Sequence, residues 1–409
     1  MSGAKNSATR LLAAALLAST PTTLENFPTR LVDVGHNIRF MEGLGVDVSL
    51  DHERQTLTIS PARLGVSAFD RSADYPIRTT YLLAAGQVLR NGRARIPYPG
   101  GCKIGARGYD QHVMVWESLG CAVVETPEAL EITGNGFAGG RIEFPISTVG
   151  GTENALLCAS VARGVTEIRN AYITPEVDDL IDLLRRMGSS IAVFGGSHIR
   201  VEGVERLDGV RMAVMPDRVE ALTWIVYAIM AGGELRIESV PFSSMEIPFI
   251  HLEKAGIDLF RSSWGVYFHP DCLRGGTVQP FELACGTHPG IISDMQPFFV
   301  LLGLMADGKS RVFDYRYPER IEYVAELARF CPAGSIEAHP GSITTRGGGP
   351  FKSAHACSTD LRGSMSLIMA ALCAQGTSRV DRVDLALRGY NDLEAKLASL
   401  GVPIEVVDE

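Results

Sequence analysis

The sequence predicts a two-domain α/β protein built from six repeats of about 68 residues, three in each domain. Two recurring patterns predict this fold. The first is a polar loop followed by an apolar helix of three or four turns and then Gly. The second is an amphipathic helix that ends in a tight turn, most often Leu-Gly, and runs into alternating strands.

The apolar segments recur at steps of about 65 to 77 residues along the whole chain. They begin at Gly3, Pro76, Thr148, Pro216, Ser293 and Thr359. Each is nearly apolar all round, so we expect these helices to be buried, with the sheets outside them. The first, within MSGAKNSATRLLAAALLAST, resembles a secretory signal, but its recurrence favours an ordinary buried helix. No segment reaches the length of a membrane span.

The amphipathic segments lie out of phase with the apolar ones. They are FMEGLGVDVSL, VWESLGCAVVE, LLRRMGSSIAVF, LEKAGIDLF and KLASLGVPIEVV, with ELARFCPAGSIEA as a degenerate sixth copy. Strands such as TLTIS and HIRVEG follow them, so each repeat is a βαβαββ unit. No strand precedes the first apolar helix. The count of repeats places the two domains at 1–212 and 213–409.

Composition excludes several classes of protein. The net charge of −9 argues against a general nucleic-acid or membrane-surface binder. Eight scattered cysteines include no C-x-x-C pair and no zinc-ligand spacing, which favours a reducing cytoplasm over a disulfide framework. An anionic ligand would therefore need locally gathered Lys and Arg.

The polar loops before the apolar helices are the best candidates for a binding site. Helix N-termini present free N–H groups and a partial positive charge, which suit anionic ligands. The loops carry Lys5-Asn6, Arg78, Thr152-Glu153-Asn154, Asp217-Arg218, Asp294-Met295-Gln296 and Asp360-Leu361-Arg362. Any one of these charges alone is better explained as a helix cap or a solvated side chain; Asp294, for example, could simply cap its helix. At equivalent positions of a repeat, they indicate a cleft between two domains, with many charges unpaired until a ligand binds.

Cys102 lies in the glycine-rich stretch YPGGCKIGAR, which has neither helical nor strand periodicity. Buried cysteine is the usual expectation, and it suits Cys158 and Cys373 in apolar helices. For Cys102 we expect an exposed loop, where Lys103 and Arg107 would favour a thiolate.

Six motifs in the same order resemble the enolpyruvyl transferases that act on UDP-N-acetylglucosamine. They are SGAKN, PGGCKIGAR, TVGGTEN, SDMQ, TDLR and LRGY. The resemblance covers essentially the whole chain and implies the two-domain enolpyruvyl-transferase fold, with the active site in the interdomain cleft. It implies transfer of the enolpyruvyl group of phosphoenolpyruvate to the 3-hydroxyl of the sugar, the first step of peptidoglycan synthesis. The shikimate-pathway enolpyruvyl transferase lacks the cysteine loop and is a poorer match.

The resemblance also implies roles for residues of this chain. Cys102 would be the general acid, Asp294 the base that takes the hydroxyl proton, and Asp360 an aid to proton delivery. Lys5, Arg107 and Arg388 would bind the donor's phosphate, and Arg362 and Arg388 its carboxylate. The implied acceptor-binding residues are Asn6, Arg78, Arg107, Gly108, Tyr109, Asp110, Gln111, Thr148, Val149, Gly150, Asp294 and Arg316. No metal or cofactor is expected, because Lys and Arg supply the charge.

The departures from the family's pattern fall on the acceptor side. The family usually has Pro at the position of Gly108 and an apolar residue at that of Gln111, and a family lysine is replaced by Val32. Three functions therefore stay open: transfer to UDP-N-acetylglucosamine, transfer to another uridine nucleotide such as UMP, and nucleotide binding without catalysis. We expect a cytoplasmic monomer or weak homo-oligomer that binds neither nucleic acid nor a membrane.

Overall fold

The computed structural model describes residues 1–60, 77–98, 108–402 and 404–407. These residues form two compact units. The N-terminal unit contains the described residues from 3 to 215, and the C-terminal unit contains residues 1–2 and those from 216 onwards. The chain passes from one unit to the other after Ser2 and again after Met215.

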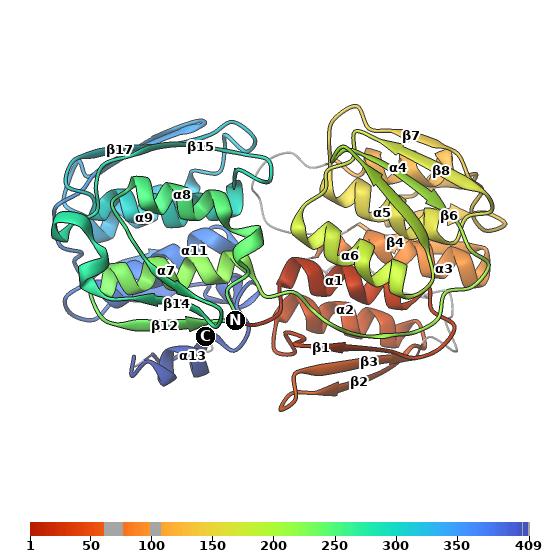
Figure 1. Ribbon diagram of the computed structural model, residues 1–409, viewed down its shortest axis with the longest axis horizontal. Coiled ribbons are helices and arrows are strands. Elements are labelled where there is room, and N and C mark those ends of the chain that lie inside the picture. Colours follow the sequence, from red (N-terminus) through yellow and green to blue (C-terminus); the bar gives the residue numbers. More distant parts are fainter. Residues whose placement is uncertain (61–76, 99–107, 403, 408–409) are drawn as a thin grey trace. The chain divides into compact units, whose positions relative to one another are not determined.

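In the N-terminal unit, helices lie inside and sheets lie outside (Figure 1). The helices are α1 (Lys5–Ala15), α2 (Val32–Gly43), η2 (Arg78–Leu83), α3 (Ala84–Asn91), α4 (Asp110–Ser118), α5 (Val149–Ser160) and α6 (Pro175–Arg186). The strands are β1 (Thr22–Glu25), β2 (Asp47–Asp51), β3 (Thr56–Ser60), β4 (Arg93–Pro97), β5 (Ala122–Glu125), β6 (Ala129–Thr133), β7 (Arg141–Glu143), β8 (Val165–Arg169), β9 (Ser190–Phe194), β10 (His198–Glu202) and β11 (Arg211–Ala213). They form sheets in the orders β11-β1-β3-β2, β4-β6-β5 and β7-β8-β10-β9.

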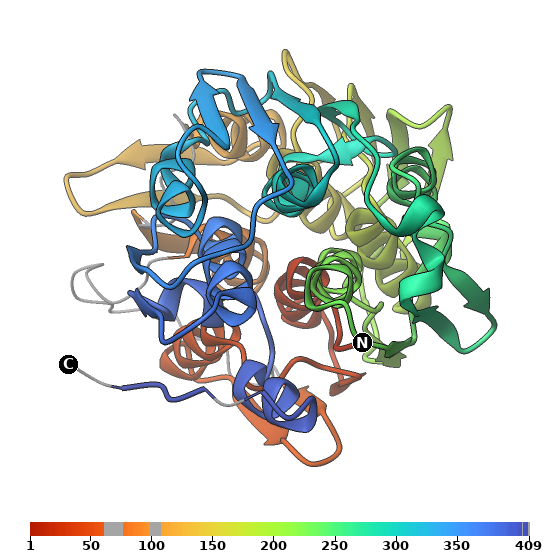
Figure 2. The same cartoon turned by 90° about the vertical axis from the view of Figure 1, so that its left-hand side faces the viewer.

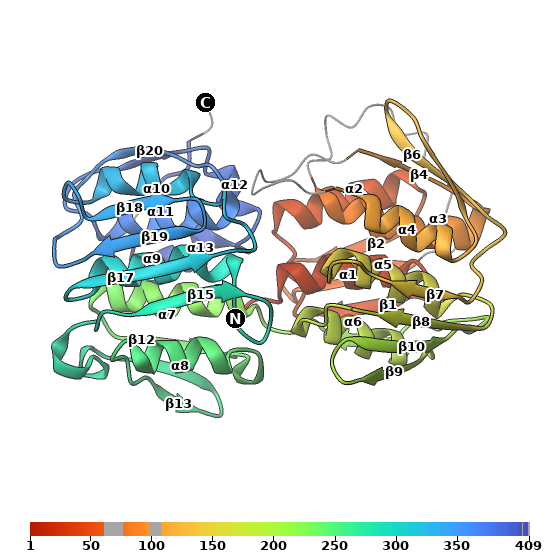
Figure 3. The same cartoon turned by 90° about the horizontal axis from the view of Figure 1, so that it is seen from above.

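The C-terminal unit repeats this plan, and Figure 2 looks along its helices, with the strands around them. Its helices are α7 (Arg218–Ala231), η3 (Phe242–Ser244), α8 (Glu246–Lys254), η4 (Pro270–Cys272), η5 (Arg274–Gly276), η6 (Ser293–Met295), α9 (Gln296–Met305), α10 (Glu322–Leu327), η7 (Ala328–Phe330), α11 (Leu361–Cys373), α12 (Asp384–Leu387) and α13 (Leu393–Ser399). Its strands are β12 (Leu235–Glu238), β13 (Phe260–Ser262), β14 (Gly265–Phe268), β15 (Glu282–Gly286), β16 (Ile291–Ile292), β17 (Lys309–Asp314), β18 (Ile336–His339), β19 (Ser342–Arg346), β20 (His355–Cys357) and β21 (Arg379–Asp381). The sheets run β12-β14-β13, β16-β15-β17-β19-β18 and β20-β21; β17 and β19 cross α9 in Figure 3.

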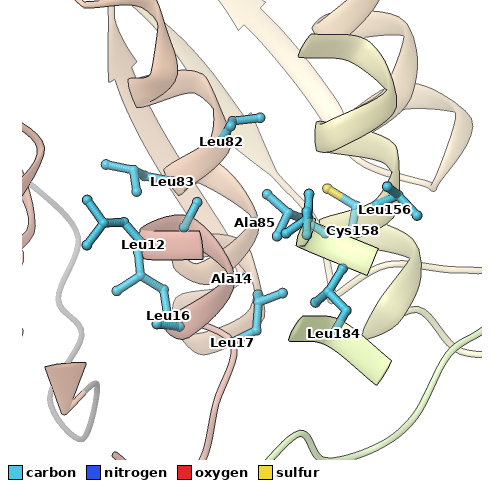
Figure 4. Close-up of a cluster of buried hydrophobic side chains, with 14 of the residues drawn as sticks. Leu12, Ala14, Leu16, Leu17, Leu82, Leu83, Ala85, Leu156, Cys158 and Leu184 are labelled. Carbon is cyan, nitrogen blue, oxygen red and sulfur yellow. The ribbon is translucent and has the colours of Figure 1, made fainter. Parts of the chain in front are cut away.

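The six apolar segments all form buried helices, so the prediction of helices inside sheets is confirmed. Every residue of α7 except Ala231 is buried. Two of the six, η2 with α3 and η6 with α9, begin as a 3-10 turn. Figure 4 shows Leu12 of α1, Leu16 directly after α1, Leu83 of η2 and Leu184 of α6 in one cluster of buried hydrophobic side chains. Burying each such leucine contributes about 1.5–3 kcal/mol.

The amphipathic helices end as their turns predict. A glycine in the left-handed region follows five of them: Gly45, Gly120, Gly188, Gly256 and Gly401. Only glycine adopts this conformation without a steric cost, which is why the helix stops there. The degenerate copy has no glycine at this point, and its helix α10 instead runs on through η7 before it ends at Cys331.

Parallel strand pairs complete the repeats. In three repeats, a strand that precedes the apolar helix pairs in parallel with the strand that follows it. These pairs are β7 with β8 around α5, β15 with β17 around α9, and β20 with β21 around α11. β11 differs, because it precedes α7 but pairs with β1, in the register Thr23 opposite Arg211. Within the described residues β12 has no parallel partner, and the amino group of Met1 donates to the carbonyl of Glu238 at its end.

Candidate active site

The predicted polar residues do lie at the starts of the buried helices. Lys5 begins α1, and Arg78 begins η2. The Asp217 carboxylate accepts bonds from the N–H groups of Val219 and Glu220 at the start of α7. Asp360 caps α11 in the same way. Asp294 lies in η6 before α9, and no side-chain cap is formed there.

Four side chains of the C-terminal unit form a cluster, Asp294, Arg320, Asp360 and Arg362, which we call the carboxylate–arginine cluster. One terminal nitrogen of Arg320 donates to Asp294 Oδ1 at 2.8 Å, and the other donates to Asp360 Oδ1, also at 2.8 Å. Arg362 Nε lies 3.5 Å from Asp294 Oδ2, which is an ionic contact rather than a hydrogen bond. The cluster therefore places two carboxylates around one guanidinium.

Asp294 is the accessible member of this cluster. Its side chain is 31% exposed, whereas those of Arg320, Asp360 and Arg362 are 6% exposed or less. Asp360 Oδ1 also accepts the N–H groups of Arg362 and Gly363. A ligand can therefore reach the Asp294 carboxylate, while Asp360 is engaged in capping its helix.

The two arginines remain charged in spite of their burial. Burial alone lowers the pKa of Arg320, but the attraction of Asp360 and Asp294 outweighs it and raises that pKa above its ordinary value. Burial likewise lowers the pKa of Arg362, and the attraction of Tyr390, Asp217 and Asp294 raises it overall. The Arg362 guanidinium carbon lies 5.1 Å from the centre of the Tyr390 ring. Arg388, the other predicted donor-binding arginine, follows α12 and is 9% exposed.

Asp314, at the end of β17, shapes the turn that carries Arg316 and Arg320. Its Oδ1 accepts the N–H groups of Arg316 and Tyr317 at 3.1 and 3.0 Å. Its Oδ2 accepts the hydroxyl of Ser293, the neighbour of Asp294. The turn and η6 are therefore connected by hydrogen bonds.

In the N-terminal unit, the predicted cation Lys5 is already paired. Its ammonium lies 2.8 Å from Asp33 Oδ2 of α2, and that aspartate is buried. The expectation that many of these charges are unpaired before a ligand binds is therefore wrong for Lys5, Asp294, Asp360 and Asp217. A buried charge without a partner costs several kcal/mol, which explains why the buried carboxylates Asp33, Asp217 and Asp360 are paired in advance.

Two predicted acceptor segments lie next to each other. Arg78 donates to the carbonyl of Gly108 at 2.8 Å. A Cβ on Gly150 would lie 3.2 Å from Nε2 of His112, so the start of α5 approaches α4 closely. Gln111 Oε1 is buried and has no hydrogen-bond partner. Tyr109, the N-terminal neighbour of α4, donates through its hydroxyl to Glu125.

His112 lies among aromatic rings at the start of α4. Its ring centre is 4.8 Å from that of Tyr81 and 6.1 Å from that of Trp116. Burial there, together with the positive charge of Arg78, lowers the pKa of His112 to about 3. His112 is therefore neutral near pH 7 and presents no charge to a ligand.

The structure leaves two predicted residues, Cys102 and Arg107, outside the described residues. Asn6, Thr148 and Val149 lie at the starts of α1 and α5, and Arg316 lies in the turn after β17. Asp110 begins α4. Sequence reasoning missed Arg320 and Asp33, which contact predicted residues 26 to 40 positions away, and Asp314, which accepts the backbone N–H of Arg316. Their only sequence signal is the charge itself, because Asp33 lies in α2, Asp314 ends β17, and Arg320 lies between β17 and α10.

The described residues contain neither a candidate metal site nor a candidate membrane span. No group of three or more His, Cys, Asp or Glu side chains there is placed to hold a metal ion. In the same residues, no helix has the length and apolar character needed to cross a membrane. The described cysteines are free.

Comparison with known proteins gives a family. The EPSP synthase (3-phosphoshikimate 1-carboxyvinyltransferase) family profile matches residues 1–397. A UDP-N-acetylglucosamine 1-carboxyvinyltransferase of Afipia carboxidovorans is 36% identical over 99% of this chain and 95% of that protein. One from Novosphingobium aromaticivorans is 34% identical over 100% of this chain and 95% of that protein.

Solved structures give the same fold. The enolpyruvyl transferase NikO from Streptomyces tendae has a TM-score of 0.87 at 24% identity, over 98% of this chain and 94% of that one. EPSP synthase from Acinetobacter baumannii has a TM-score of 0.74 at 19% identity, over 100% of this chain and 96% of that one. The predicted two-domain enolpyruvyl-transferase fold is thus confirmed, and the chain belongs to the EPSP synthase family of carboxyvinyltransferases.

Proposed function

We propose that this protein transfers the enolpyruvyl group of phosphoenolpyruvate to the 3-hydroxyl of UDP-N-acetylglucosamine, which is the first step of peptidoglycan synthesis. The observation that carries the proposal is full-length similarity, at 33–36% identity, to proteins named for this transfer. The carboxylate–arginine cluster supports it, because it offers one accessible carboxylate beside two buried cations.

The proposed reaction is an addition followed by an elimination. Asp294 takes the proton of the acceptor hydroxyl, whose oxygen bonds to C2 of phosphoenolpyruvate, while Cys102 gives a proton to C3. The tetrahedral adduct then loses phosphate from C2 and a proton from C3, which restores the double bond. Atoms and charge balance without an oxidant or a reductant.

The charged residues around the donor would stabilise this reaction. The donor is trianionic, and Lys5, Arg107, Arg362 and Arg388 are assigned to its phosphate and carboxylate by family resemblance. Fixed cations that are held by buried partners need little reorganisation as charge develops in the transition state. Asp33 for Lys5 and Tyr390 for Arg362 are such partners.

Phosphate release tests the function. The purified chain is mixed with phosphoenolpyruvate and either UDP-N-acetylglucosamine or UMP, and the organic product is identified by mass. We expect release with UDP-N-acetylglucosamine and a product heavier by one enolpyruvyl group. Release with UMP alone would assign the protein to another uridine nucleotide, a reading that Gly108 and Gln111 keep open. Release with neither acceptor would indicate nucleotide binding without catalysis.

A second experiment tests the role proposed for Cys102. An epoxide phosphonate of the fosfomycin type should alkylate its thiol and add one inhibitor mass to the intact protein. The Cys102→Ser variant is the control and should gain no mass, although the other cysteines remain. An unmodified wild-type protein would contradict the placement of Cys102 beside the donor.

The proposal includes the setting of the reaction. We infer a cytoplasmic protein that is a monomer or a weak homo-oligomer and binds neither nucleic acid nor a membrane; its net charge of −9 supports the last two points. Light scattering during gel filtration checks the oligomeric state.

A further inference from the structure

We propose that Arg10 is a further acceptor-binding residue, and that its guanidinium donates to a phosphate group of the nucleotide acceptor. The inference rests on the proposed function for the identity of that acceptor. It goes beyond that function, because Arg10 belongs to none of the residue sets that family resemblance assigns to donor or acceptor. The observation behind it is a partly open arginine near the start of α1.

Helix α1 is open to solvent only near its start. Every residue of α1 is buried except Lys5, Asn6 and Arg10. Arg10 lies one turn after Asn6, so these two side chains share one face of the helix. Helical side chains lean toward the N-terminus of their helix. The Arg10 side chain therefore extends toward the end of α1 where two predicted ligand-binding residues lie.

Helix α5 brings its own start to the same place. Arg10 Nε donates to Oε1 of Glu153 at 2.6 Å, and Glu153 lies about one turn after the start of α5. Val149 and Gly150, both predicted to bind the acceptor, are the only residues of α5 that are not buried. The pair of Arg10 and Glu153 therefore joins two helices that are each open at the N-terminal end alone.

The Arg10 guanidinium keeps one donor nitrogen in reserve. Nε donates to Glu153, and Nη1 donates to the hydroxyl of Thr9 at 2.9 Å. Among the described residues, no group accepts a hydrogen bond from Nη2, and that nitrogen is not one of the buried atoms without a partner. Solvent therefore reaches Nη2, although the side chain as a whole is only 13% exposed. A guanidinium that is fixed at two nitrogens and open at the third suits an oxyanion such as phosphate.

The buried partner of Arg10 determines what the guanidinium offers to a ligand. Glu153 is 1% exposed, so it holds the guanidinium in place and offsets much of its positive charge. Arg10 therefore contributes directed N–H donors more than a long-range attraction for anions. The oxygens of a nucleotide diphosphate accept such donors, and the free N–H groups at the start of α5 favour the same ligand. Uridine without phosphate has no anionic oxygen to place there.

A simpler role for Arg10 is that it only neutralises the buried carboxylate of Glu153. The double variant Arg10→Met/Glu153→Met separates the two roles, because it removes both charges together. Replacing a buried ion pair with apolar residues is often neutral or stabilising, so this variant should fold. If Arg10 is only a counterion, the double variant binds nucleotides as the wild type does.

The experiment measures the Kd of UDP, UMP and uridine by calorimetry or, for weak binding, by ligand-observed NMR. In the double variant, the Kd of UDP should rise by about tenfold, because one charge-assisted hydrogen bond is lost. The Kd of uridine should change by less than about twofold. In the phosphate-release assay, the KM of the acceptor should rise with the Kd of UDP, and the KM of phosphoenolpyruvate should stay unchanged.

The matched control is Arg141→Gln/Glu143→Gln, which removes an exposed pair of the same unit. Its Kd values should equal those of the wild type. Arg10→Lys is the second variant, because it keeps a cation beside Glu153 but loses the planar fork. The Kd of UDP should rise by about threefold or more in Arg10→Lys, again with little change for uridine. If the double variant does not fold, as judged by thermal unfolding, Arg10→Lys decides.

The binding arm does not depend on catalysis, so the two proposals can fail separately. If the wild type releases no phosphate with UDP-N-acetylglucosamine but its Kd for UDP depends on Arg10, the proposed function fails and the role of Arg10 stands. If the double variant binds UDP as tightly as the wild type does, the role of Arg10 is overturned. Equal losses for UDP and uridine would overturn it too, because they indicate a general structural effect. A higher KM for phosphoenolpyruvate with an unchanged Kd for UDP would overturn it in favour of donor binding.

Discussion

The two units hold charges at their helix N-termini in different ways. In the C-terminal unit, Arg320 bridges Asp294 and Asp360 at equal distances. In the N-terminal unit, Lys5 pairs with the buried Asp33, and Arg78 donates to a backbone carbonyl. One unit thus contains an interlocked carboxylate cluster, and the other contains separate cations and a buried Gln111 amide oxygen without a hydrogen-bond partner. The same repeat can therefore hold its charges in an interlocked cluster in one unit and in separate pairs in the other.

Replacement of the accessible carboxylate gives the largest expected effect. In Asp294→Asn, kcat should fall by about 10²–10⁴-fold, because an amide cannot take the hydroxyl proton. KM for phosphoenolpyruvate should hardly change. Steady-state phosphate release measures both. Asp307→Asn, at the exposed opposite end of α9, is the control, and equal losses in both variants would contradict a specific role for Asp294.

The buried ion pair of the N-terminal unit should matter for stability. Arg10 Nε lies 2.6 Å from Glu153 Oε1, and Glu153 is 1% exposed. Glu153→Gln leaves the guanidinium without its charged partner and should lower the free energy of unfolding by about 3–5 kcal/mol. Urea denaturation measures this loss.

The exposed pair of Arg141 and Glu143 supplies the comparison for Glu153. Glu143→Gln should leave the urea midpoint unchanged, because solvent screens that pair. If Glu153→Gln also left the urea midpoint unchanged, the buried pair of Arg10 and Glu153 would not contribute to the stability of the N-terminal unit.

Asp179 should make the stability of the N-terminal unit depend on pH. Burial raises its pKa to about 6, although it accepts bonds from the hydroxyl of Ser7 and the N–H of Met215. The native chain therefore holds a proton that the unfolded chain loses near pH 4. Stability should fall by about 3 kcal/mol as pH rises from 4 to above 6.

Urea midpoints measured from pH 4 to pH 7 test this slope. Asp179→Asn should flatten it, because the variant has no carboxyl group to titrate there. The control is Asp182→Asn, because Asp182 of α6 is about half exposed and paired with Arg186. This variant should keep the wild-type slope. A steeper or unchanged slope in Asp179→Asn would assign the titration to another group.

Gln111 gives the smallest expected effect and tests acceptor recognition alone. Gln111→Leu removes a buried oxygen without a partner and should raise the free energy of unfolding by about 1 kcal/mol. If the acceptor is UDP-N-acetylglucosamine, its KM should fall by about threefold while that of phosphoenolpyruvate stays unchanged. Gln279→Leu, which loses bonds to the carbonyls of Arg274 and Thr277, should be destabilised instead. A change in the KM of phosphoenolpyruvate in Gln111→Leu would contradict the proposal that Gln111 affects only acceptor binding.

Much of the fold followed from patterns within single repeats. The apolar period predicted six buried helices, and the turns predicted left-handed glycines such as Gly188 and Gly256. These features are local, so propensity and hydrophobic period are enough to reveal them.

The pairing of charges did not follow from the sequence. Lys5 and Asp33 lie 28 positions apart, and Arg320 and Asp360 lie 40 apart, in different elements. No periodicity connects such residues, because their approach depends on how helices pack. We therefore predicted where Asp294, Asp360 and Lys5 lie along the helices, but not which partners hold them.

The parallel pairing of β1 with β11 can form only after most of the N-terminal unit has been synthesised. β1 is made early, yet the strand beside it, Arg211–Ala213, leaves the ribosome only about 190 residues later. At about 5–20 residues per second, the edge of β1 waits for roughly 10–40 seconds. An exposed strand edge invites pairing with other chains during that interval. A nascent chain halted before residue 211 should therefore be more prone to aggregate than one released after residue 215.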